Sequence, residues 1–162
     1  MRIETIDTSV VRVTFIHCTY PKCSHCAHEQ KTLAWLLENF NQYNAGEILP
    51  IVVVQDPKTR ELMVYDGNIR TDFAKQKGIQ LKAVVLTSQA DLEQYLSNNS
   101  LSWFGIRDFA ELLEYMRIYV QYPNAEEKMP PDLEAKIRAK DLKDRADLQR
   151  QRNEMYGWYD DD

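Results

Sequence analysis

The chain has 162 residues, a hydrophobic content of 44% and a formal net charge of −5. This length and composition predict one globular domain with an appendage, and the negative charge excludes a chain drawn to nucleic acid or membrane by an overall basic field. No apolar run approaches the roughly 18 residues of a membrane span, and the first residues lack a signal-peptide core, so we expect a cytoplasmic protein without structural disulfides.

The first half of the chain predicts alternating strands and helices. Residues 10–16 alternate in polarity and are β-branched, which indicates a strand, and leucines at helical spacing predict a helix over about 29–43. An unbroken apolar run at 51–54 predicts a strand buried on both faces. A turn at 56–59 then returns the chain into an antiparallel strand at 62–65. The last two strands form a predicted hairpin.

The hairpin leads into a tight loop at 66–68, a helix over 71–77 and a strand at 81–86. The loop places Gly67 and Arg70 at the start of that helix. A helix start offers unpaired backbone N–H groups and the positive end of the helix dipole. Glycine lets these groups approach an anion, and arginine adds a planar charge suited to phosphate. The loop is therefore a predicted phosphate site.

The polar residues around this loop leave its role open. Asn68 can donate a hydrogen bond to a phosphate, but Asn68 or Asp66 can instead cap the helix, which would leave Arg70 as a surface residue on an ordinary turn. Asp66 and Asp72 flank the loop and could both approach a Mg²⁺ ion that carries the phosphate, which makes them the candidate catalytic residues. Asp72 can equally serve only the helix dipole. Asp56 also lies near the loop in sequence.

The second half of the chain predicts helices. Thr or Ser at 87–88 can cap a helix that ends near residue 96, and apolar residues predict another helix over about 102–120. The stripe on the second helix is either core or a groove for a protein partner. From residue 130 the chain is rich in charge and predicts a solvated helix with an acidic tail. The expected parts are a core at 1–88, a packed helical extension at 89–122, and a polar helix and tail at 123–162.

All three cysteines and all three histidines lie between residues 17 and 28. Cys23-x-x-Cys26 has the chelate spacing of zinc sites, and Cys18 with a histidine such as His28 would complete a tetrahedral set, although the usual second ligand pair is missing. The same motif at a helix start would suit a redox pair activated by the helix dipole. Reduced cysteines in a loop, without a further role, are the third interpretation.

Several segments occur in the order and spacing of a known family. They are Pro-Ile-Val-Val at 50–53, Asp-Gly-Asn-Ile-Arg at 66–70, and then Ala74 and Gly78. With the helix expected before residue 50, the chain resembles the ParB/sulfiredoxin-like domain. The resemblance implies an α+β fold, a small mixed sheet with helices, in which the glycine and arginine of the loop contact nucleotide phosphates. Some relatives hydrolyse nucleotides or nick DNA, so it also implies nuclease or NTPase activity and DNA as a partner.

The chain departs from the family pattern at this loop. Sulfiredoxins carry a catalytic cysteine between the glycine and the arginine, and this chain has none there, which argues against sulfinic acid reduction. Many relatives place histidine before the arginine, whereas this chain has Ile69, which cannot hydrogen-bond or transfer a proton. The second phosphate motif of ParB proteins, Glu-Asn-x-x-Arg, and their helix-turn-helix DNA readers are not found in this sequence.

We therefore expect an α/β or α+β protein that binds a nucleotide triphosphate, with Mg²⁺, through Gly67, Asn68 and Arg70, with weak nuclease or NTPase activity left open. The alternative is a non-catalytic module that contacts a protein or DNA, with a zinc-stapled N-terminal segment and partner-binding C-terminal helices. Ile69 favours the alternative, and the intact Gly67 and Arg70 favour nucleotide binding.

Overall fold

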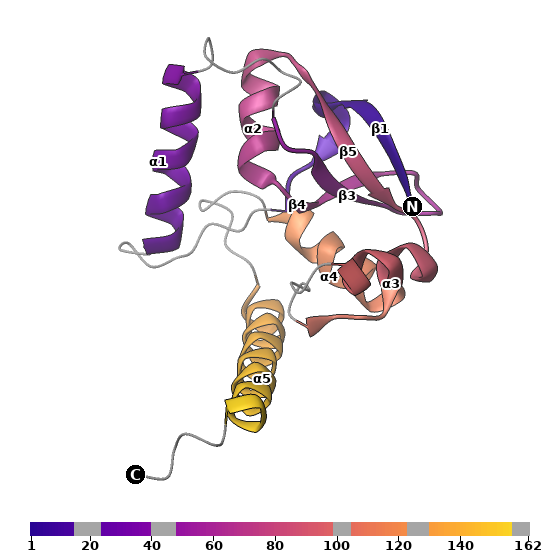
Figure 1. Cartoon of the computed structure of the whole chain (residues 1–162), viewed down its shortest axis with the longest axis vertical. Helices are drawn as coiled ribbons and strands as arrows, with labels where there is room; N and C mark the ends of the chain where they lie inside the picture. The colour runs from indigo at the N-terminus through magenta and orange to yellow at the C-terminus, as the bar shows by residue number, and fades with distance from the viewer. Residues whose placement is uncertain (15–23, 40–47, 99–104, 123–129, 157–162) are drawn as a thin grey trace.

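The computed structural model describes residues 1–14, 24–39, 48–98, 105–122 and 130–156, except for the side chains of 24–30, 152, 155 and 156. This part of the chain forms a five-stranded mixed sheet with helices on both faces, which confirms the predicted α+β class (Figure 1). The strands are β1 (Arg2–Asp7), β2 (Val11–Arg12), β3 (Ile51–Gln55), β4 (Leu62–Asp66) and β5 (Gln80–Leu86). The helices are η1 (Thr8–Val10), α1 (Ser24–Asn39), α2 (Asn68–Lys77), α3 (Gln89–Asn98), α4 (Phe109–Gln121) and α5 (Pro131–Tyr156).

Strand β3 is the centre of the sheet, whose order is β1-β5-β3-β4-β2. All its residues are buried, as the unbroken apolar run predicted, because it has a strand on each side and helices on each face. β3 pairs antiparallel with β4, which confirms the hairpin, and parallel with β5. Asp66 pairs with Val52 and Leu62 with Gln55, so the loop after β4 lies beside the start of β3.

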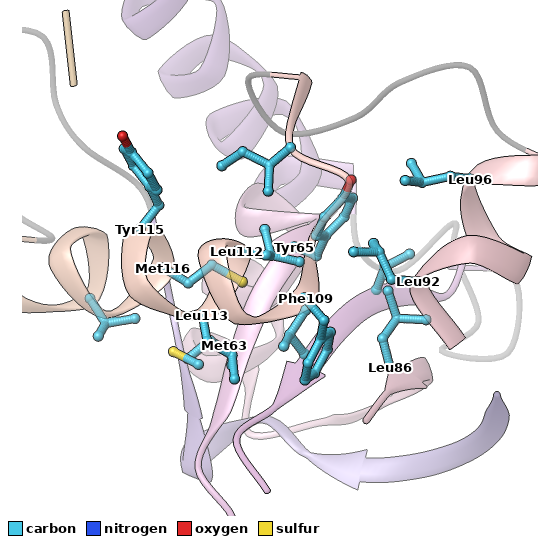
Figure 2. Close-up of a cluster of buried hydrophobic side chains, with 14 residues drawn as sticks. Met63, Tyr65, Leu86, Leu92, Leu96, Phe109, Leu112, Leu113, Tyr115 and Met116 are labelled. Carbon is cyan, nitrogen blue, oxygen red and sulfur yellow. The ribbon is translucent and has the colours of Figure 1, made fainter. Parts of the chain in front are cut away.

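The sheet separates two hydrophobic cores. Ile51 and Val53 point to the face covered by α2, and the alternate residues Val52 and Val54 point to the face covered by α3 and α4. α1 packs beside α2 on the first face (Figure 1). Figure 2 shows the second core, where side chains from α3 and α4 meet the sheet. The labelled residues are Met63, Tyr65, Leu86, Leu92, Leu96, Phe109, Leu112, Leu113, Tyr115 and Met116.

The apolar stripe of α4 therefore belongs to the core. Leu112 and Met116 are fully buried against the sheet and α3, so the interpretation of this stripe as a partner groove is wrong. The helix also begins later than predicted, at Phe109 instead of near residue 102. Asp108 caps it, because its Oδ1 accepts a hydrogen bond from the Glu111 N–H at 2.8 Å.

Three further elements differ from the prediction. β1 was not expected, because it forms through antiparallel pairing with β5, which lies far away in sequence. β2 ends at Arg12, two residues before Thr14 uses its N–H and hydroxyl on other partners. α1 begins at Ser24, so the second half of the cysteine and histidine segment is helical instead of a loop.

Helix α5 docks on α4 through its first half. Lys140 donates to Glu111 at 2.7 Å, Lys136 pairs with Glu114, and Ile137 packs against the core beneath. The helix then extends away from the sheet (Figure 1). None of the helices in the described ranges is long and apolar enough to cross a membrane. The three-part division of the chain at residues 88 and 122 stays a prediction.

Candidate functional site

Gly67 forms the tight junction between β4 and α2. Its φ of 102° is a left-handed conformation that side chains rarely adopt. A Cβ atom at this position would lie 2.7 Å from Cγ2 of Ile51 and 3.0 Å from an Nη atom of Arg70. Ile51 is fully buried, so it cannot move away. The backbone of the loop therefore lies directly on the start of β3, with the Arg70 guanidinium beside it.

The Arg70 guanidinium is only weakly satisfied where it lies. Nη2 donates to the Pro50 carbonyl at 3.3 Å and to the Asp66 carboxylate at 3.4 Å, both longer than the 2.7–2.9 Å typical of charge-assisted hydrogen bonds. The side chain is 26% exposed, and its Nε is buried without a hydrogen-bond partner in the described part of the chain. This partly buried charge retains unused hydrogen-bonding capacity.

Among the residues that the structure describes, no side chain caps the start of α2. Its N-cap residue is Gly67, which has no side chain to offer. In contrast, Asp108 caps α4, and the Ser88 hydroxyl accepts from the Asp91 N–H at the start of α3. The alternative in which Asp66 or Asn68 caps α2 is therefore wrong. The positive end of this helix lies beside the Arg70 guanidinium.

Asn68 ties the loop to the chain that follows β2. Its Oδ1 accepts from the Thr14 N–H at 3.0 Å, and the buried Thr14 hydroxyl donates to the Val64 carbonyl at 2.6 Å. We refer to these contacts of Thr14, Asn68 and Val64 as the Thr14 clamp. The clamp already uses the Asn68 amide, so it holds α2 at the end of β4. A direct phosphate contact by Asn68 stays a prediction.

The three aspartates near the loop in sequence have different surroundings in the structure. Asp66 is exposed and contacts Arg70, whereas Asp72 is half-buried within α2 and already has an interaction partner. Asp56 lies at the opposite end of the hairpin, where it pairs with Arg117 of α4. No three His, Cys, Asp or Glu side chains in the described ranges converge as a metal site. Among the described residues, Asp66 is the acid that contacts the arginine of the loop, and a role for Asp72 stays a prediction.

The proposed zinc ligands fall on parts of the chain whose side chains the structure does not describe. Cys18 and Cys23 lie outside the described residues. Cys26 and His28 lie in α1, where only the backbone is described. The zinc set, the redox pair and the inert cysteines all stay predictions.

Sequence reasoning missed Tyr95 of α3, which lies beside the loop. Its ring packs edge-on against Tyr65, with centroids 5.5 Å apart and an angle of 79° between the rings. Burial raises the pKa of the Tyr95 phenol, and the charge of Asp66 and the Tyr65 phenol raise it further, while Arg70 opposes them. Tyr95 is thus close enough to sense both charges of the loop. No local pattern marks it, because α3 reaches the loop only through the tertiary fold.

Comparison with known proteins gives little to add to this geometry. No protein-family model matches the chain, and no curated protein matches it significantly. Among solved structures, the chain is similar to the C-terminally truncated chromosome-partitioning protein ParB from Caulobacter crescentus, complexed with CTP-γ-S. The identity is 18% and the TM-score 0.39, over 64% of this chain and 56% of the ParB chain. A TM-score this low carries no assignment of family or ligand, and this chain spans little more than half of that ParB chain.

Proposed function

We propose that the loop at 66–70 binds the phosphates of a nucleotide, as the nucleotide-binding part of a ParB-like domain. One observation carries the proposal: the guanidinium of Arg70 lies against Gly67 at a helix start that no side chain of the described residues caps. Phosphate oxygens accept hydrogen bonds from both guanidinium and backbone N–H groups, and a helix start favours negative charge. These residues therefore suit a phosphate better than a neutral ligand.

The partial satisfaction of Arg70 supports the same proposal. Its contacts to Pro50 and Asp66 are long, so an incoming phosphate would replace weak interactions with short charged ones. A hydrogen bond to a charged group contributes about 1.5–3 kcal/mol. An arginine whose guanidinium already made strong hydrogen bonds would lose as much hydrogen-bond energy as it gained from the phosphate.

Asp66 makes the proposed binding depend on a divalent cation. Its carboxylate contacts Arg70 and is 63% exposed, so it would repel a bare phosphate at the same guanidinium. Mg²⁺ is commonly held by one or two carboxylates together with ligand phosphates, and Asp66 would supply one of these carboxylates. The variant Asp66→Asn should therefore bind phosphate more tightly without Mg²⁺ and respond less to its addition.

The proposal covers binding of the nucleotide and does not include its hydrolysis. Ile69 stands directly before Arg70 and cannot transfer a proton, and Asp72, the second candidate catalytic residue, lies within α2 with a partner of its own. A protein partner at α5, DNA as a partner and a zinc-stapled N-terminal segment remain the competing proposal of a non-catalytic interaction module.

A thermal-shift titration tests the binding proposal. The ligands are ATP, CTP, GTP and pyrophosphate, each with and without Mg²⁺, on the wild type, Arg70→Ala and Arg60→Ala. Arg60 is the matched control, because it is an exposed arginine at the other end of the same two strands. A ligand at 100 times its Kd raises the stability of the native state by about 2.7 kcal/mol.

We expect at least one ligand to raise the Tm of the wild type and of Arg60→Ala, and to leave Arg70→Ala unchanged. A shift that both arginine variants lose equally would indicate nonspecific charge attraction. No shift at millimolar ligand would overturn nucleotide binding and leave the interaction module as the better proposal.

A further inference from the structure

Tyr95 is held firmly beside the phosphate loop. It lies on α3, whose buried residues Leu92 and Leu96 fix the helix on the sheet. Its ring meets Tyr65 edge-on at 5.5 Å, an arrangement that aromatic pairs favour. Tyr65 is itself buried and directly precedes Asp66 in the chain. The position of the ring is therefore set by the same strand that sets the loop.

The surroundings of Tyr95 combine an apolar ring with the charges of the loop. The side chain is half-buried, so part of it reaches solvent. Asp66 and Arg70 both act electrostatically on its hydroxyl, and burial raises the pKa of this hydroxyl above its ordinary value. The site thus combines the charged side chains of Asp66 and Arg70 with the aromatic ring of Tyr95 on α3.

An inorganic phosphate would contact only the loop at 66–70 in this site. The part of a nucleotide beyond its phosphates is a sugar and a flat base, and bases stack on aromatic side chains with a gain that is largely independent of base identity. A tyrosine also offers a hydroxyl to the sugar or base.

Resting on the proposed function, we propose that Tyr95 is the contact for the nucleoside part of the ligand. The residue makes the site select nucleotides over pyrophosphate, while Arg70 binds the phosphates common to both. Stacking of this kind changes affinity by roughly tenfold or more. The selectivity should be broad among bases, because a ring face does not read their edges.

Calorimetric titration of the full chain tests this role by a ratio of affinities. The Kd of pyrophosphate and of each of ATP, CTP, GTP and UTP is measured with Mg²⁺ for the wild type, Tyr95→Phe, Tyr95→Leu and Arg70→Ala. Tyr95→Leu keeps an apolar side chain beside Tyr65 but removes the ring face, and the half-buried position should tolerate the smaller residue without loss of the fold. Tyr95→Phe keeps the ring and removes only the hydroxyl.

We expect Tyr95→Leu to lower the preference for nucleotide over pyrophosphate about tenfold and to change the Kd of pyrophosphate less than twofold. Tyr95→Phe should keep most of the preference. An unchanged preference in Tyr95→Leu, or equal weakening of both ligand classes, would overturn the role of Tyr95. Pyrophosphate binding that does not depend on Arg70, or no binding at all, would instead overturn the proposed function on which it rests.

Discussion

Each end of the β3–β4 hairpin carries an Asp–Arg pair, and the two pairs differ in burial and in hydrogen bonding. At the turn, Asp56 is 2% exposed and accepts hydrogen bonds from Nε of Arg117 at 3.1 Å and from the Lys58 N–H at 2.8 Å. At the other end, Asp66 is 63% exposed and meets Arg70 at 3.4 Å. The carboxylate of the first pair is saturated, in the sense that neighbouring groups satisfy its hydrogen bonds. The carboxylate of the second pair is not.

The backbone shows the same contrast. Both ends contain a residue with positive φ, Arg60 at the turn and Gly67 at the loop. Arg60 is exposed, so a side chain fits there in spite of the unfavourable φ. Gly67 lies against Ile51 and Arg70, so no side chain fits. The turn stabilises the fold through ordinary side chains. The loop has no room for a side chain at Gly67 and has weaker hydrogen bonds, features that are common at ligand sites.

The largest effect is expected from Gly67→Ala. The added Cβ would collide with the fully buried Ile51 in a backbone conformation that alanine disfavours, so the free energy of unfolding should fall by about 3 kcal/mol. Urea denaturation measures this loss. Gly78→Ala is the control, because Gly78 also has positive φ but nothing lies within 4 Å of its Cβ position, and it should cost only about 1 kcal/mol. Equal losses would mean that Gly67 is not crowded.

Asp56→Ala should be the next most damaging change. It leaves the turn N–H groups of Lys58 and Thr59 without their acceptor and removes the partner of Arg117, at a cost of about 2–3 kcal/mol. Asp66→Ala, at the unsaturated end, should change the free energy of unfolding by less than about 0.5 kcal/mol. Comparable losses in the two variants would remove the contrast between the ends.

Acid should weaken the saturated end, where Asp56 lies. Burial raises the pKa of the Asp56 carboxyl, but hydrogen bonds from Arg117 and the turn backbone outweigh it and leave this pKa below its ordinary value. A lowered folded-state pKa gives stability that is complete above the unfolded pKa of about 3.9 and is lost as the pH falls through the folded pKa. The stability difference between wild type and Asp56→Asn should therefore shrink from pH 5 to pH 3. A constant difference would contradict the pairing.

A small effect of the opposite sign is expected at Arg60. Glycine relieves the unfavourable φ of 65°, so Arg60→Gly should raise the free energy of unfolding by about 0.5 kcal/mol after the added freedom of the unfolded chain is counted. Arg60→Ala keeps the unfavourable φ and should leave stability unchanged. If alanine stabilised as much as glycine, the charge of Arg60 and not its backbone would be the cause.

The parts of the fold that depend on neighbouring residues could be predicted from the sequence. The buried strand β3, its turn, β4, and α2 with Gly78 at its end all follow from local patterns. The loop was found for the same reason, because Gly67 and Arg70 lie close together in the chain. What such patterns cannot supply is pairing across long separations, as between β1 and β5.

The same limit applies within the candidate site. Tyr95 reaches the loop from α3, and Thr14 reaches Asn68 from the chain after β2; neither contact leaves a mark on the local sequence. The late start of α4 at Phe109 was missed because the apolar spacing continues before it, and only the cap at Asp108 ends that pattern. Polar capping overrides periodicity when the two disagree.

The Thr14 clamp has a consequence for the order in which the site is assembled during folding. Every residue proposed to touch the ligand lies between β3 and α3, in one continuous stretch whose loops are short. The clamp instead joins Thr14 to Asn68, across a loop of chain that includes α1. Long loops cost more entropy to close and form contacts later. We therefore expect the phosphate loop to appear early in folding and to acquire its fixed position last, when the clamp closes.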